Sequence, residues 1–261
     1  MRKRSSVRVH PKKIKSLAHF MEVAQQIKKE MCGSGEIFFP WFRGHSDSNY
    51  SLLPGLYRQK DKGTIADEHQ FRHDFKLKAF PFLSDTYTPP SNDWDWYFIM
   101  QHYGLPTRLL DWSEGALVAF YFAIRDAKPG KDACVWVLNP FTLNHEVAKI
   151  DDAILTHEYY DLSNYLGKVW SKDKMSLYPI AIQPSINSRR IAAQKGCFTL
   201  HGDKRVPLEK IESLKSSLVK IEIDKQKIEN IREELIMAGI TESLIFPELS
   251  GLSRELMDYW K

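Results

Sequence analysis

Polar side chains that could bind anions or transfer protons are concentrated just before the most apolar stretch of the chain. Gln101, His102, Thr107, Arg108 and Asp111 lie within eleven positions. An arginine donates paired hydrogen bonds to a phosphate or carboxylate, and a histidine changes its charge near neutral pH. Because burying such groups without partners is costly, they either pair with one another, as Arg108 with Asp111, or line a cleft.

A second polar group follows the apolar and aromatic residues 37–42, which the sequence predicts to be a strand. Arg43 and His45 follow the end of this strand, a location where ligand contacts are common. The alternative is that Arg43 belongs to a surface ion pair, which contributes little to stability.

A third polar group lies in the second half of the chain. Arg190 and Gln194 are four residues apart and share one face if their segment is helical. Thr199 and His201 share one face of an expected strand. Three acids beside later apolar segments could act as a general base or contact a ribose: Glu222, Glu242 and Glu248.

His69 and His73 have the spacing of two metal ligands on one helical face. The residues between them lack the glutamate of a zinc-protease helix. We therefore interpret this face as solvated and predict no metal site. The chain also has no phosphate-binding loop of the P-loop type, and the sequence identifies no cofactor.

The element expected to position the first group is the apolar run from Ala116 to Ile124. Its nine residues leave no polar face at a helical period, which indicates a helix buried on all sides. Asp111 and Glu114 have the spacing of a capping box that would begin this helix. No apolar run of eighteen residues and no signal-peptide pattern occurs, so we predict a cytoplasmic protein that does not enter a membrane.

Apolar runs with the character of strands recur along the chain. We expect strands at 37–42, 133–138, 177–183, 196–201 and 218–223, with helices grouped between the first two. No Gly-x-Gly-x-x-Gly turn of a doubly wound parallel sheet is present. The sequence therefore predicts one α+β domain, with a mixed sheet of about five strands flanked by helices and one central buried helix.

The positive charge of the chain is concentrated at its beginning. Residues 1–15 hold seven Lys or Arg and no acid, and the rest of the chain then has 30 basic and 33 acidic residues. We expect a basic arm at residues 1–15 and one domain at 16–261. Such an arm can contact the phosphates of nucleic acid or extend into solvent as a frayed terminus. The oligomeric state is left open.

Four segments of the chain resemble, in order, the motifs of the FRG domain family. This family is named for a Phe-Arg-Gly signature, found here as Phe42-Arg43-Gly44. The four segments are residues 41–58, 101–123, 190–202 and 239–252, and the second is the most specific. The resemblance implies a bacterial, intracellular domain and does not by itself define a reaction.

The polar positions of these motifs coincide with the three groups described above. We therefore expect one pocket in which up to three arginines hold an anion, such as a phosphate of a nucleotide or nucleic acid. The residues expected there are Arg43, His45, Gln101, His102, Thr107, Arg108, Arg190 and Gln194.

Two functions follow from such a pocket. The first is a nucleotide-directed enzyme similar to ADP-ribosyltransferases, in which Arg43 holds the pyrophosphate and Glu242 engages the ribose, with His45 and His102 as further catalytic residues. The strand at 196–201 departs from that family's Ser-Thr-Ser pattern and matches it only at Thr199. The alternative is a non-catalytic module that binds nucleic acid or a nucleotide, in defence against phage.

Overall fold

A computed structural model of the chain describes residues 7–31, 39–59, 63–83, 90, 92–150, 153–156, 179–186 and 188–260. Over these residues the strands form one mixed sheet in the order β1-β8-β4-β2-β3-β7-β6-β5. The bounds of the strands are β1 Arg8–Val9, β2 Trp41–His45, β3 Leu109–Ser113, β4 Ala133–Leu138, β5 Leu155–Thr156, β6 Ile180–Gln183, β7 Gly196–Leu200 and β8 Leu218–Ile223.

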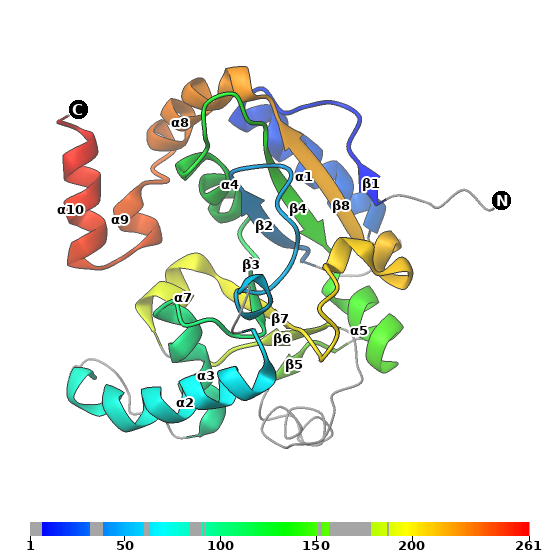
Figure 1. Ribbon diagram of the computed structural model, residues 1–261. Coiled ribbons are helices and arrows are strands. Elements are labelled where there is room, and N and C mark those ends of the chain that lie inside the picture. The colour runs from blue at the N-terminus through cyan, green and yellow to red at the C-terminus, as the bar shows by residue number, and fades with distance from the viewer. Residues whose placement is uncertain are drawn as a thin grey trace.

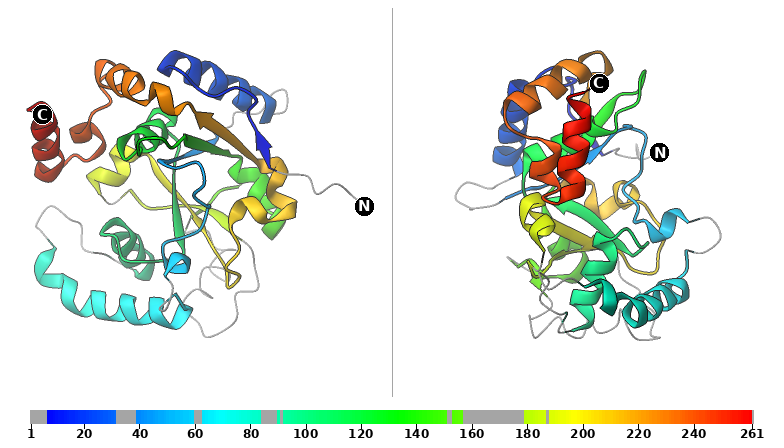
Figure 2. Two further views of the ribbon diagram at one scale, coloured as in Figure 1. Left: turned by 45° about the horizontal axis from the view of Figure 1, so that its top comes forward. Right: turned by 90° about the vertical axis from the view of Figure 1, so that its left-hand side faces the viewer.

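Helices lie on both faces and at the ends of this sheet (Figures 1 and 2). The mixed α/β architecture agrees with the prediction. The bounds of the helices are α1 Leu17–Met31, α2 Ile65–Ala79, α3 Asp93–His102, α4 Ala116–Arg125, α5 Pro140–Ala148, α7 Arg189–Gln194, α8 Ile228–Met237, α9 Glu242–Ile245 and α10 Leu249–Asp258.

The prediction of about five strands was wrong, because the described residues contribute eight. β1 and β5 have only two residues each, too few to give an alternating pattern. β3 carries buried side chains on both sides of one exposed aspartate, so it has no simple alternation. Of the expected strands at 37–42 and 177–183, residues 37, 38, 177 and 178 lie outside the described residues.

β2 begins later than predicted, so Arg43 and His45 lie inside the strand and not beyond its end. Pro40 directly precedes it and has no N–H to donate to a sheet. Within β2, Arg43 and His45 alternate with Phe42 and Gly44, and their side chains therefore share one face.

The sheet is nearly divided in two between β2 and β3. These strands are joined at a single register pair, Phe42 with Ser113. In contrast, β2 pairs with β4 at five positions, and β3 pairs with β7 at five. One half consequently holds β1, β8, β4 and β2, and the other holds β3, β7, β6 and β5 (Figure 1).

Helix α4 packs directly against β2, and none of its ten residues is exposed. A Cβ atom at Gly44 would lie 2.0 Å from the carbonyl oxygen of Ala119 and 2.5 Å from the nitrogen of Ala123. Only glycine permits this approach of strand and helix, which gives the Phe-Arg-Gly signature a structural reason at its third position.

The expected capping box of this helix was wrong. Its N-cap is Gly115, which makes no side-chain capping bond. Asp111 belongs to β3, and Glu114 accepts a hydrogen bond of 2.9 Å from Gln183 Nε2. A five-residue strand and a tight turn thus precede α4.

Two hydrophobic cores cover the two faces of the sheet. The core between the sheet and helices α1, α4 and α8 includes Phe20, Phe120 and Ile231. The larger core includes Trp41, Trp136 and Phe98 of α3. Among the described helices, none is long and apolar enough to span a lipid bilayer.

Candidate functional site

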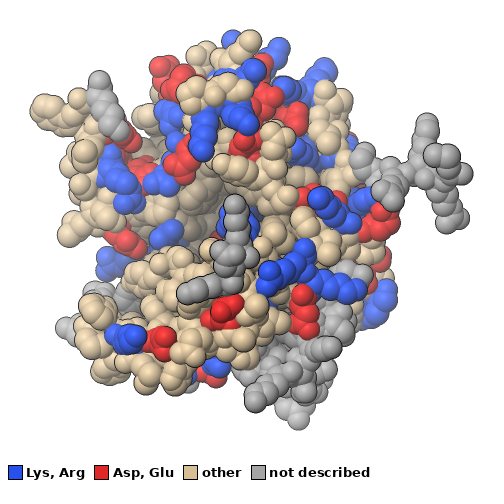
Figure 3. Space-filling view, in the orientation of Figure 1, with Lys and Arg blue, Asp and Glu red and all other residues tan. Residues whose placement is uncertain are grey.

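A cavity of about 920 Å³ opens where β2 and β3 separate. Its walls come from β2, β3, the end of α3, and residues of α4 and α7. Figure 3 shows the surface hollowed between the two halves of the molecule, with Lys and Arg side chains beside the hollow. Volumes of this order are typical of pockets for small ligands and cofactors.

Arg43 bridges the two halves of the sheet at the floor of this cavity. Its Nη1 donates a hydrogen bond of 2.5 Å to the backbone carbonyl of Asp111 in β3 and lies 3.5 Å from the Asp111 carboxylate. Its Nε donates to His45 Nε2 at 3.0 Å. The side chain is 16% exposed, and burial lowers its pKa from the ordinary value. Within the described part of the chain, its Nη2 has no hydrogen-bond partner.

His45 is the acceptor for Arg43 and is therefore a neutral imidazole. It is 6% exposed, and burial together with the charge of Arg43 lowers its pKa to about 3. His201, fully buried near the same guanidinium, also has its pKa lowered by burial to about 3. The lone pair of His45 Nε2 is already occupied, so this histidine orients Arg43 in the observed arrangement.

Gln101 holds the Asp111 carboxylate from the other side. Its Nε2 donates to both carboxylate oxygens, at 2.9 and 3.0 Å. The Gln101 Oε1 in turn accepts a hydrogen bond of 2.5 Å from the Thr107 hydroxyl. Thr107 is fully buried and does not line the cavity, so its contribution is to fix the orientation of the amide.

Arg190 and His102 approach the cavity from α7 and α3. Arg190 Nη1 lies 3.4 Å from the backbone carbonyl of His102, and its guanidinium carbon lies 4.7 Å from the centre of the Phe246 ring. Burial lowers the pKa of Arg190, while the carboxylates of Glu248 and Asp111 act in the opposite direction.

His102 is mostly buried beside Arg190. Burial, followed by the charge of Arg190, lowers its pKa from the ordinary value. Its Nε2 lies 3.7 Å from Glu248 Oε1, too far for a good hydrogen bond. Gln194, one helical turn after Arg190, donates to the carbonyl of Ile245 at 3.2 Å.

Arg108 does not line this cavity. Its side chain is 1% exposed, and its Nε donates a hydrogen bond of 2.7 Å to Glu68, which is fully buried. Tyr97 bonds to the same carboxylate. Burial alone would lower the pKa of Arg108, but Glu68 raises it above its ordinary value. The alternative in which Arg108 pairs with Asp111 was therefore wrong, because Glu68 of α2 binds the guanidinium.

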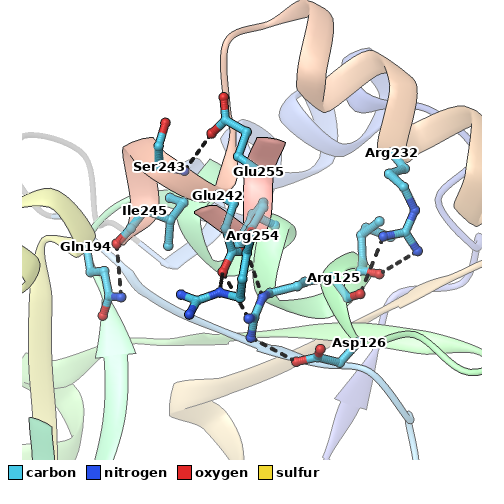
Figure 4. Close-up of polar contacts among 11 residues, drawn as sticks. Arg125, Asp126, Gln194, Arg232, Glu242, Ser243, Ile245, Arg254 and Glu255 are labelled. Carbon is cyan, nitrogen blue, oxygen red and sulfur yellow. Dashed lines mark hydrogen bonds and ion pairs between the residues drawn. The ribbon is translucent and has the colours of Figure 1, made fainter. Parts of the chain in front are cut away.

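Glu242 does not line the cavity either, and its carboxylate faces Arg125 and Arg254 (Figure 4). Arg125 binds both carboxylate oxygens, at 2.9 and 3.0 Å, Arg254 Nε donates at 2.6 Å, and the Tyr121 hydroxyl adds a further bond. Burial opposes ionisation, but these hydrogen bonds lower the pKa of Glu242. The four side chains border a second cavity of about 660 Å³ between α4, α8 and α10.

Six of the nine residues expected at the site thus line the cavity: Arg43, His45, Gln101, His102, Arg190 and Gln194. Thr107, Arg108 and Glu242 do not. The sequence did not identify Arg58 and Tyr50, which also line it. Their signal was present, because both belong to the first segment that resembles the FRG motifs.

Asp111 was interpreted as a helix cap and is instead the carboxylate most closely bound to the cavity's polar groups. The other acid of the lining, Asp126, pairs with Arg125 at 3.4 Å. Across the described ranges, no three side chains of His, Cys, Asp or Glu are grouped as they would be around a metal ion.

Comparison with known proteins identifies part of the chain. The family model of the FRG domain matches residues 40–132, which confirms the resemblance of the first two segments, 41–58 and 101–123; the segments at 190–202 and 239–252 lie outside the match. No curated protein and no solved structure matches the chain. The matched segment runs from the start of β2 to the start of β4 and supplies most of the cavity wall, including the bridge between Arg43 and Asp111. The match to the FRG domain thus covers residues 40–132 of the 261-residue chain.

Proposed function

We propose that the cavity between β2 and β3 binds an anionic ligand of nucleotide size. The observation that carries this proposal is that two arginines of the cavity wall form no ion pair within the described residues. In the described residues, Arg58 and Arg190 line the cavity without an ion pair to any carboxylate within 4.0 Å. Unpaired guanidiniums at the wall of a concave site attract and bind phosphates.

The apolar and aromatic part of the lining supports an organic anion over a simple one. Tyr50 lines the cavity, is 46% exposed and contacts the His45 ring edge-on, with 6.1 Å between ring centres. Phe122 of α4 lines it as well. Flat aromatic surfaces beside cationic groups suit a nucleobase joined to phosphates.

Calorimetric titration with ADP and with inorganic pyrophosphate tests this proposal. We expect both to bind, and Arg190→Ala to weaken each by about tenfold, the loss typical of one charged hydrogen-bonding partner. Arg189→Ala is the matched control, because the neighbouring arginine of α7 is exposed and outside the cavity. Absence of binding at low salt, or an equal loss in both variants, would refute the proposal.

A second candidate is a nucleotide-directed enzyme similar to ADP-ribosyltransferases. It is favoured by Arg43 on a strand at the opening of the sheet, where it could hold a pyrophosphate. Glu242 is a poor candidate for the ribose-binding acid, since its carboxylate is bound by Arg125 and Arg254 at a different cavity. Release of nicotinamide from NAD by wild type, lost in Arg43→Ala and kept in Glu242→Gln, would support this activity.

The nucleic-acid-binding alternative gives a different result in the same titrations. Phosphate-dominated binding to a single strand weakens steeply with salt. It would also depend on residues 1–15, of which Arg8 and Lys13 pair with Glu30 and Asp132. Loss of oligonucleotide binding on deletion of residues 1–15, with ADP binding unchanged, would favour a module that binds nucleic acid, including one acting in phage defence.

A further inference from the structure

Asp111 places a carboxylate in a cavity whose lining also includes Arg43, Arg58 and Arg190, and its position is fixed on two sides. Gln101 donates to both carboxylate oxygens, and Arg43 Nη1 lies 3.5 Å from Oδ2. The side chain nevertheless remains 56% exposed. The carboxylate is therefore held in one orientation with a large part of its surface open.

The open part of this carboxylate can only accept hydrogen bonds. Each ionised carboxyl oxygen has room for two donors, and Gln101 occupies one place on each. Both oxygens thus keep acceptor capacity. Two hydroxyl groups on adjacent carbons of a sugar present two donors side by side, which matches a pair of oxygens held in this way.

The neighbouring charges select among the possible partners of Asp111. A metal ion or an amine beside it would be repelled by Arg43 and Arg190, whereas an uncharged hydroxyl is not. A bare polyphosphate would be attracted by the arginines but repelled by the carboxylate. A ligand that carries phosphate at one end and hydroxyls at the other satisfies both.

We propose that Asp111 accepts hydrogen bonds from sugar hydroxyls, and that the ligand of this cavity is a ribose phosphate ester such as a ribonucleotide. This assignment rests on the proposed function and defines its ligand class. Arg190 and Arg58 bind the phosphates, Gln101 and Arg43 hold the carboxylate in place, and Thr107 fixes Gln101.

The test compares three probes on the same protein: ADP, 2′,3′-dideoxy-ADP and inorganic pyrophosphate. Wild type should bind ADP about 10-fold to 100-fold more tightly than the dideoxy compound, the range expected for hydrogen bonds to a charged acceptor. In Asp111→Ala the two nucleotides should bind equally. Pyrophosphate should bind that variant at least as tightly as wild type, because a repelling charge has been removed.

Asp126→Ala is the matched control, since this aspartate also lines the cavity but pairs with Arg125. It should keep the preference for ADP over the dideoxy compound. Tight pyrophosphate binding shows that Asp111→Ala is folded, which a melting curve checks independently. Equal binding of both nucleotides to wild type, or a preference that survives in Asp111→Ala, overturns the assignment while leaving anion binding intact. Failure of all three probes instead overturns the proposed function.

Discussion

The guanidinium of Arg43 joins β2 to the backbone carbonyl of Asp111 in β3, across the line where these strands part. The backbone of β2 pairs with that of β3 only at Phe42 and Ser113. The side-chain hydrogen bond of Arg43 therefore connects the two strands beyond the end of their backbone pairing. Arg43, the arginine of the Phe-Arg-Gly signature, therefore holds β2 and β3 together and also lines the cavity.

We expect Arg43→Ala to lower the free energy of unfolding by about 1–3 kcal/mol, because the Asp111 carbonyl and the buried His45 lose their donor. Arg58→Ala should change it by less than about 0.5 kcal/mol, since this exposed side chain makes no hydrogen bond within the described residues. Urea unfolding of both variants measures the difference. Equal stability would show that the bridge contributes nothing to the fold.

Gly44→Ala should be strongly destabilising, by about 3 kcal/mol or more, because the new methyl group would overlap the backbone of α4. Gly196→Ala in β7 is the control, because its Cβ would meet ordinary contacts of 3.7 Å or longer. Denaturation midpoints compare the two. Similar midpoints would mean that α4 can move away from β2 at little cost.

Arg108→Ala should lower the free energy of unfolding by about 3–5 kcal/mol, since it leaves Glu68 charged, buried and without its cation. The double variant Arg108→Met, Glu68→Leu should recover part of this loss, because no unpaired charge remains. Under conditions in which they are folded, the single and the double variant should both bind ADP with the affinity of wild type. A lower ADP affinity in Arg108→Ala, with an unchanged free energy of unfolding, would show instead that Arg108 contributes to ligand binding.

The sequence located most of the cavity because its polar residues surround segments with strong local patterns. Arg190 and Gln194 are indeed on one helix, and the apolar run at 116–124 is a buried helix. The same reasoning assigned Asp111 to a helix cap, because the spacing of Asp111 and Glu114 is also that of a capping box. The strand β3 is defined by its pairing with β7, which no local pattern reveals.

Arg108 and Glu242 were misplaced for a related reason. Each is an ionisable residue beside an apolar segment, and the sequence cannot distinguish a side chain that lines a cavity from one bound by distant partners. Glu68 lies 40 residues before Arg108, and Arg125 lies 117 residues before Glu242. Such long-range ion pairs follow from the topology alone.

Buried neutral histidines should make the protein sensitive to acid. In the folded state the pKa values of His45 and His201 are about 3, against about 6.5 for an exposed histidine. Between these values the unfolded chain binds more protons, so stability is fully present above about pH 6.5 and falls as the pH drops toward 3.

Replacing one of these histidines should reduce that dependence. His201→Gln should lower the slope of unfolding free energy against pH by about 1.4 kcal/mol per pH unit between pH 4 and 6. An unaltered slope in His201→Gln would mean that this imidazole is already protonated in the fold.

The carboxylate of Glu242 attaches α9 and α10 to the rest of the molecule through Arg125 of α4 (Figure 4), and the Tyr121 hydroxyl of the same helix adds a second bond. Removing its charge leaves two guanidiniums partly buried without their anion. We expect Glu242→Gln to increase cleavage by protease in residues 239–252 several-fold, because these short helices lose their main polar contact with α4.

Glu229→Gln is the control, since within the described residues that side chain forms only an exposed pair with Arg232 at 3.2 Å. ADP affinity should stay within about twofold of wild type in both variants, because neither residue lines the cavity between β2 and β3. Protection equal to that of wild type would show that Phe246, held between arginines, is sufficient to anchor this end of the chain.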